Sequence, residues 1–161
     1  MAEAHLWSAA SPIEKRFLHQ DYPPPEECSR MEWRLECIWV LLWALGYIQE
    51  LDWPSDMCDV QKLIKILKPH EANPLKFIAT AKLRSKKEIL DAADLTARIH
   101  WAIRDAYANN SPIPCSLDWS NNDDMLPVSQ CAATGVVEER HRTLKWLIRL
   151  GNADWDDVDS F

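Results

Sequence analysis

The scarcity of glycine is the feature that most restricts how this chain can fold. Only 3 of the 161 residues are Gly, whereas 10 are Pro. Folds built from many short strands need tight turns at positive φ, and those turns depend largely on Gly. The glycine count therefore argues against an all-β fold and against a glycine-rich phosphate-binding loop. A chain of this length is expected to form one domain that buries roughly two-thirds of its unfolded surface.

Apolar residues recur at helical spacing in several segments, and capping patterns mark where helices start. Ser29 with Glu32, and Ser85 with Glu88, have the spacing of a capping box. No segment alternates with a period of two for long enough to predict a strand. We therefore predict an all-α, bundle-like fold in a single compact domain, 1–161. Its predicted helices span residues 11–19, 29–47 (broken near Gly46), 59–67, 74–81, 86–108 and 136–150 (ended by Gly151).

Three stretches lie outside these helices. Residues 1–10 precede the first helix and are expected to be disordered. Residues 109–134 are rich in Asn, Ser, Asp and Pro and show no periodicity. They predict a long irregular insert before the last main helix, which is either functional or loosely ordered. Residues 152–161 form an acidic tail.

Charge, cysteine content and hydropathy exclude several function classes. The chain has 18 Lys+Arg and 25 Asp+Glu, and its net charge of −7 argues against binding nucleic acid. The five cysteines are odd in number and none are two to four residues apart, which predicts neither a disulfide framework nor a zinc site. The longest apolar run, 37–48, is shorter than the ~20 residues that span a bilayer, and no signal peptide is visible. We expect a cytoplasmic protein without a cofactor, a metal or a membrane partner. The basic group Lys82, Arg84, Lys86 and Lys87 is expected to be a solvated helix start.

Four charged residues fall on apolar helix faces when each helix is wound at about 100° per residue. Glu36 lies among tryptophans, Arg140 lies in the middle of an apolar face, and His100 and Arg104 share the apolar arc of helix 86–108. An unpaired buried charge is costly. We therefore expect these four side chains to meet, or each to pair with a nearby carboxylate such as Glu139.

Such a cluster has two readings. It is either an ion-pair network that fixes helix register, or a polar pocket in which His100 or His141 acts as an acid or base near neutral pH. In the second reading Arg104 and Arg140 would hold an anion. The candidate catalytic set is then Glu36, His100, Arg104, Glu139, Arg140 and His141. A deep, open pocket lined by Arg104, Arg140 and His100 would favour an enzyme or a small-molecule binder, whereas a closed, paired cluster would favour an interaction protein.

Five motifs occur in order along the chain: WVLLWALG at 39–46, ILD at 89–91, RIHWAIRDA at 98–106, VVEERH at 136–141 and DWDDV at 154–158. This succession resembles the bacterial family known as domain of unknown function 4272, over about residues 11–158. The resemblance implies that His100, Arg104, Arg140 and His141 belong to the family signature, but it implies no activity. The chain departs from the family pattern in the insert around 116–134 and at Leu144-Lys145-Trp146, where the family has Leu-Asn-Trp. Members commonly have further sequence ahead of residue 11, so the chain is either a short member or a fragment.

Six of the nine tryptophans fall into two groups. Trp39, Trp43, Trp101 and Trp146 lie on predicted helices that must pack together, so they are expected to build the core. Trp119 and Trp155 stand in irregular acidic stretches, where an indole beside carboxylates is a plausible anchor for a partner.

We therefore expect a non-enzymatic interaction protein, most concretely an immunity-type protein that neutralises a cognate, basic toxin by direct binding. Acidity favours fast association with a basic partner. The expected contact residues are Asp118, Trp119, Asp123 and Asp124 in the insert, and Asp154, Trp155, Asp156 and Asp157 in the tail. Simple packing of Trp155 onto the body and a solubilising role for the acidic loop remain alternatives. A further alternative is Ca²⁺ binding by Asp154, Asp156, Asp157 and Asp159, although the twelve-residue calcium-loop pattern is absent. The sequence leaves the oligomeric state open.

Overall fold

The computed structural model describes residues 2–71, 73–121 and 123–159, with side chains described from Leu6 onward. Helices account for 63% of the chain and the only sheet in the described residues has two short strands, which confirms the all-α prediction. The α-helices are α1 (Ala2–Ala9), α2 (Pro12–Leu18), α3 (Pro25–Ala44), α4 (Val60–Leu67), α5 (Pro74–Thr80), α6 (Lys86–Ala108) and α7 (Ala133–Leu147). The strands are β1 (Ile113–Pro114) and β2 (Met125–Leu126), and short 3-10 helices are η1 (Lys68–His70), η2 (Val128–Gln130), η3 (Leu150–Asn152) and η4 (Trp155–Asp157).

Capping explains where the long helices begin. The capping box predicted at Ser85 is present: its hydroxyl accepts the Glu88 N–H at 3.2 Å, and the Glu88 carboxylate accepts the Ser85 N–H at 3.0 Å. The box predicted at Ser29 is wrong, because α3 begins earlier, at Pro25. A proline at the first helical position has its φ already set and needs no N–H partner there. The prolines before Glu26 therefore start the helix rather than separate it from the preceding one.

The end of α3 follows the prediction. The helix stops at Ala44, and Gly46 takes a φ of +80°. A Cβ at this position would lie 2.9 Å from the Lys82 carbonyl oxygen, so both the backbone conformation and the close approach require glycine.

The last helix differs at both ends from its predicted bounds. Gly135 was expected to precede the helix but lies within α7, where a Cβ would come within 2.6 Å of the Trp33 ring on α3. The glycine therefore permits close packing of two helices. The helix ends at Leu147, before Gly151, because the chain turns at Arg149 with a φ of +57°.

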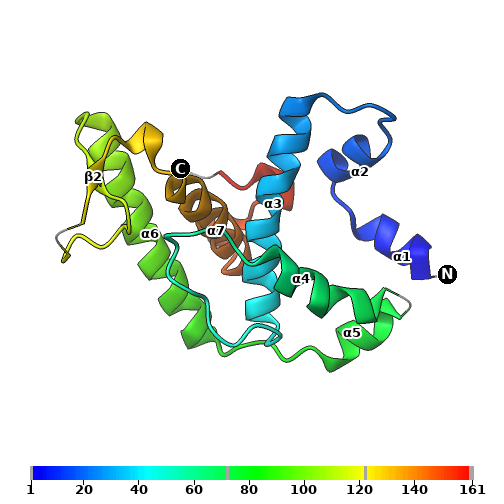
Figure 1. Cartoon of the computed structure of the whole chain (residues 1–161). Coiled ribbons are helices and arrows are strands. Elements are labelled where there is room, and N and C mark those ends of the chain that lie inside the picture. Colours follow the sequence, from blue (N-terminus) through cyan, green and yellow to red (C-terminus); the bar gives the residue numbers. More distant parts are fainter. Residues whose placement is uncertain (1, 72, 122, 160–161) are drawn as a thin grey trace.

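Helix α7 is the centre of the body and packs against both α3 and α6 (Figure 1). Helices α4 and α5 lie by the C-terminal end of α3, and α1 and α2 lie beside α3 on the side away from α6 (Figure 1). Helix α6 keeps an exposed apolar side, with Leu90 42% and Trp101 71% exposed. The core assignment of Trp101 was therefore wrong, while Trp39 and Trp43 are buried as predicted and Trp146 is partly exposed.

Two hydrophobic clusters hold the body together. The first surrounds Trp39 and Leu144 between α3, α4, α7 and the start of α6. The second joins Ile103 and Val137 to residues of the insert, including Ile113 and Leu117, which are fully buried. The insert therefore contributes buried residues to the core.

The N-terminal stretch and the insert contain more regular structure than expected. In place of the disorder expected for residues 1–10, the structure has helix α1. Within 109–134, β1 and β2 pair antiparallel, with Ile113 opposite Leu126. Among the described residues, no helix combines the length and apolarity needed to cross a bilayer.

Candidate functional site

Glu36 on α3 and Arg140 on α7 form a closed ion pair. The Arg140 Nε donates to Glu36 Oε2 at 3.1 Å, and the two side chains are 3% and 0% exposed. Glu36 Oε1 accepts the Cys58 backbone N–H at 2.5 Å, and Arg140 Nη1 donates to the Asp52 carbonyl oxygen at 2.6 Å. Glu36 and Arg140 thus hydrogen-bond to each other and to the backbone of the segment between α3 and α4. This arrangement corresponds to the ion-pair network, the first of the two alternatives that the sequence left open.

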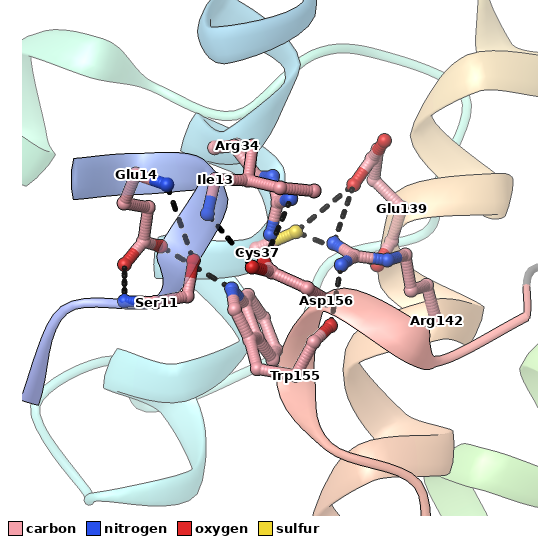
Figure 2. Close-up of polar contacts among 9 residues, drawn as sticks. All are labelled: Ser11, Ile13, Glu14, Arg34, Cys37, Glu139, Arg142, Trp155 and Asp156. Carbon is pink, nitrogen blue, oxygen red and sulfur yellow. Dashed lines mark hydrogen bonds and ion pairs between the residues drawn. The ribbon is translucent and has the colours of Figure 1, made fainter. Parts of the chain in front are cut away.

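Glu139, next to Arg140 on α7, belongs to a separate cluster with Cys37 and Arg142 (Figure 2). Its carboxylate accepts a hydrogen bond from the Cys37 thiol at 3.0 Å and lies 3.8 Å from Arg142. Burial and the Glu139 charge raise the pKa of Cys37 to about 12, so the thiol stays protonated. Arg142 is buried and donates to the Trp155 carbonyl oxygen at 2.6 Å.

The same cluster fastens the acidic tail to the body (Figure 2). The Trp155 ring lies against the guanidinium groups of Arg34 and Arg142, and its Nε1 donates to Glu14 Oε1 at 3.2 Å. Asp156 Oδ2 accepts the Ile13 backbone N–H at 2.9 Å. The side chains of these two tail residues therefore contact α2, α3 and α7, which agrees with the packing alternative given for Trp155.

The other aspartates of the tail keep exposed side chains. Asp154 and Asp157 are exposed, as is Asp159, whose carbonyl oxygen accepts from Lys145. In the part of the chain that the structure describes, no group of three or more His, Cys, Asp or Glu side chains is placed to hold a metal ion. The Ca²⁺ alternative therefore gains no support from the tail.

His100 on α6 and His141 on α7 form a polar contact of their own, away from Glu36. Their Nδ1 atoms lie 2.7 Å apart and the rings meet edge to face. One Nδ1 donates and the other accepts, so the contact exists only while at least one ring is neutral. Burial lowers the pKa of both rings, and with the neighbouring His100 and Lys145 charges it lowers that of His141 to about 4.

The predicted meeting of four charged residues is therefore only partly right. Glu36 meets Arg140, and His100 meets His141 instead. Arg104 is exposed, because it lies just outside the arc of α6 that faces α7. It borders a hollow of about 420 Å³ with His100, Tyr107 and Glu138, whereas Arg140 borders a different cleft.

A family model described as Domain of unknown function (DUF4272) matches residues 1–158. The chain belongs to this family. The match covers the ion pair, the histidine pair and the tail, and it extends the resemblance noted from residue 11 to the start of the chain. Comparisons with curated proteins and with solved structures found no significant match.

In this DUF4272 protein the acidic residues of the insert differ in what they do. Asp118 accepts from Ser120 and Asn121, and these hydrogen bonds lower its pKa. Asp123 accepts from Ser116. Asp124 is exposed, and among the described residues no side-chain partner holds its carboxylate. Asp118 and Asp123 therefore shape the turn, whereas Asp124 is open to a partner.

The insert of the DUF4272 protein is joined to the segment between α3 and α4 through a tryptophan that the sequence analysis did not single out. Trp53 Nε1 donates to the Ser116 carbonyl oxygen at 2.7 Å. Trp53 stays 44% exposed, and Trp119, three residues beyond Ser116, stays 46% exposed. The sequence signal for this position was a tryptophan directly after an aspartate in the segment Leu51-Asp52-Trp53. Asp52 precedes Trp53 in the same way as Asp118 precedes Trp119.

A cleft of about 460 Å³ lies next to Trp53, between residues 49–54 and the first half of α6. Its walls combine acidic, aromatic and apolar side chains with two arginines. They include Trp43, Glu50, Leu51, Asp52, Trp53, Arg84, Glu88, Asp91, Leu95, Ile99 and Arg140. Arg84 was expected at a solvated helix start, but its guanidinium donates to carbonyl oxygens at the end of α3 and beyond, among them Trp43 at 2.8 Å.

Proposed function

We propose that this protein acts by binding a basic partner protein through the surface formed by the insert and the segment 49–57. In its most concrete form the partner is a cognate toxin, which the bound protein neutralises. The hydrogen bond from Trp53 to Ser116 is the observation that carries the proposal, because it holds two chain segments with exposed indoles as one surface. Large rigid aromatic side chains are the residues that most often anchor protein interfaces.

The charges of this surface support a basic partner. Asp52, Asp56 and Asp124 are exposed in the two segments, and the chain as a whole carries −7. Acidic residues at the rim of an interface speed up encounter with a positively charged protein and lose this effect as salt rises. Association with the partner is therefore expected to weaken at moderate salt.

The closed Glu36–Arg140 pair supports binding over the catalytic alternative. Arg140 pairs with Glu36 and donates to a backbone carbonyl, while His100 and Arg104 border another hollow. The arrangement does not bring Arg104, Arg140 and His100 to one open pocket, which was the feature that would have favoured an enzyme.

Affinity capture with point variants tests the proposal. The tagged protein is used as bait at low and moderate salt, and captured proteins are identified by mass spectrometry. Trp119→Ala is expected to reduce capture of the partner at least tenfold, since truncating an anchor of this kind costs about 2 kcal/mol or more. Point variants are preferable to deleting the insert, because deletion would remove Ile113 and Leu117 from the core.

Trp101→Ala is the matched control, since Trp101 is also exposed but lies on α6 outside this surface. Equal capture by the Trp119 and Trp101 variants, or no stoichiometric partner at either salt concentration, would contradict the proposal. The neutralising role has its own test: expressing the captured protein alone should arrest growth, and co-expressing the wild-type chain, but not Trp119→Ala, should restore it.

A further inference from the structure

The cleft beside Trp53 combines apolar, aromatic and charged side chains. One wall is the first half of α6, with Asp91 and Leu95, and the other is the segment 49–54. Its volume is about 460 Å³, within the range of small-ligand pockets. Leu95 and Trp53 are both close to half exposed, which leaves apolar surface open inside a hollow rimmed by charge.

The two arginines of the cleft are already occupied. Arg140 is held by Glu36 and the Asp52 carbonyl oxygen. Arg84 donates to three backbone carbonyl oxygens and pairs with Glu88 at 3.0 Å. Both guanidinium groups are therefore already bound by carboxylates and carbonyl oxygens of the protein.

The two carboxylates on the wall formed by residues 49–54 have no side-chain partner among the described residues. Within the described residues, the side chains of Glu50 and Asp52 accept no hydrogen bond and form no ion pair. On the helix wall Asp91 pairs with Lys87 at 2.6 Å, but both side chains are mostly exposed, and such surface pairs are weak. The open charge of the cleft is therefore negative.

The indole of Trp53 adds a fixed aromatic surface to this charge. The hydrogen bond to Ser116 holds its Nε1 end, so the ring is oriented without an added ligand. The cleft also contains an internal example of the interaction expected there, because the Arg84 guanidinium lies 5.0 Å from the centre of the Trp43 ring. A cation beside an indole is stabilised by the electron-rich face of the ring.

We infer that this cleft receives an arginine side chain of the partner protein, its guanidinium bound between the carboxylates of Glu50 and Asp52 and the Trp53 ring. The inference rests on the proposed function for the source of the arginine. Arginine fits better than lysine, because its planar group is weakly hydrated, stacks on aromatic rings and bridges carboxylates with two donors. Its aliphatic stem would cover apolar surface at Leu95.

NMR titration of the full chain with N-acetylarginine amide tests the cleft without any partner. We expect saturable shifts of the Trp53 indole N–H and of backbone amides in 49–53 and 91–96. N-acetylcitrulline amide, which has nearly the same shape without the charge, is expected to produce no saturable shift. Trp53→Phe identifies the indole signal among the nine tryptophans.

Variants with a matched control decide which groups bind. Glu50→Gln and Asp52→Asn are each expected to weaken the arginine amide about two- to fivefold, and the double variant about tenfold. Asp56→Asn makes the same charge change in the same exposed segment, outside the cleft lining, and should change affinity by less than the single variants. Glu50 and Asp52 are both exposed, and Asp52→Asn keeps the backbone carbonyl oxygen that accepts from Arg140.

Equal shifts with the citrulline amide, no saturable shift in the cleft, or equal weakening by Asp56→Asn would each overturn the inference. The outcome is separable from that of the proposed function. If a partner is captured through Trp119 but the arginine amide does not bind, the cleft assignment fails and the binding role stands. If the amide binds and no partner is captured, the proposed function fails and the cleft remains a guanidinium site.

Discussion

Glu36 and Arg140 stand 104 positions apart in the sequence and form an ion pair in which neither side chain is more than 3% exposed. Each also holds the backbone of the segment between α3 and α4, at Cys58 and Asp52. The pair therefore couples the packing of α7 on α3 to the position of the segment that forms one wall of the cleft.

Replacing Arg140 by Met is expected to lower the free energy of unfolding by about 3–5 kcal/mol, because it leaves the Glu36 charge buried without its partner. Urea unfolding followed by circular dichroism measures the loss. Adding Glu36→Gln to this variant should recover part of it, since the remaining group is neutral. Asp94→Asn, which breaks the exposed Asp94–Arg98 pair, should cost less than about 1 kcal/mol. A similar small effect of Arg140→Met would contradict the role assigned to the buried pair.

Stability is expected to fall on acidification because of the histidine pair. Burial lowers the pKa of His100 and His141 in the folded protein, to about 4 for His141, below the ordinary value of 6.5. Between these pH values the unfolded chain binds more protons, so stability is full above about pH 6.5 and declines as pH falls toward 4. We expect a loss of about 1–3 kcal/mol across this window.

His141→Gln should flatten this part of the pH profile, because it removes the more strongly shifted group and the contact between the two Nδ1 atoms. Urea midpoints measured at intervals from pH 7.5 to 4.5 provide the comparison. An unchanged slope in the variant would show that other groups produce the acid sensitivity.

Asp156 is expected to stabilise the N-terminal helix α2 from the far end of the chain. Asp156→Ala removes the acceptor of the Ile13 N–H and the carboxylate 3.9 Å from Arg34, at a cost of about 1–2 kcal/mol. Hydrogen exchange at the Ile13 amide should speed up by about tenfold or more. Asp157→Ala is the control, because that side chain is exposed and should leave the exchange rate unchanged. Equal rates in the two variants would exclude the tail contact as the source of protection.

The five cysteines should differ sharply in reactivity. Cys115 is exposed, whereas Cys37, Cys58 and Cys131 are buried and Cys28 is partly buried. Burial raises the pKa of Cys37 and Cys58 to about 12, so neither forms the reactive thiolate near pH 8.

Iodoacetamide labelling read by mass spectrometry should therefore modify Cys115 first. Cys115→Ser should remove the fast phase, and urea should restore labelling of the buried thiols. Fast labelling of Cys37 in the native state would mean that its contact with Glu139 opens readily.

The fold was largely predictable because its signals are local. The capping box at Ser85, the break at Gly46 and the helical spacing of apolar residues each depend on residues within a few positions. The Ser29 box failed because Pro25 provides an earlier start that propensity favours more strongly. The presence of a buried ionisable residue on each of α3, α6 and α7 was also visible from the sequence, since winding a helix shows which positions face inward.

The partners of those charges were decided only by the tertiary structure. Which helix faces meet depends on how α3 and α6 pack on α7, and a rotation of a few tens of degrees separates buried His100 from exposed Arg104. The same packing places the Arg142 guanidinium against the Trp155 ring. Trp155, which the sequence offered as an anchor for a partner, therefore packs on the helical body. By itself the sequence determined the helices and the charges placed on their inner faces, because these follow from local geometry. The tertiary structure alone decided that Glu36 pairs with Arg140, that the histidines pair with each other and that Trp53 joins the insert, because those contacts depend on residues brought together from distant parts of the chain.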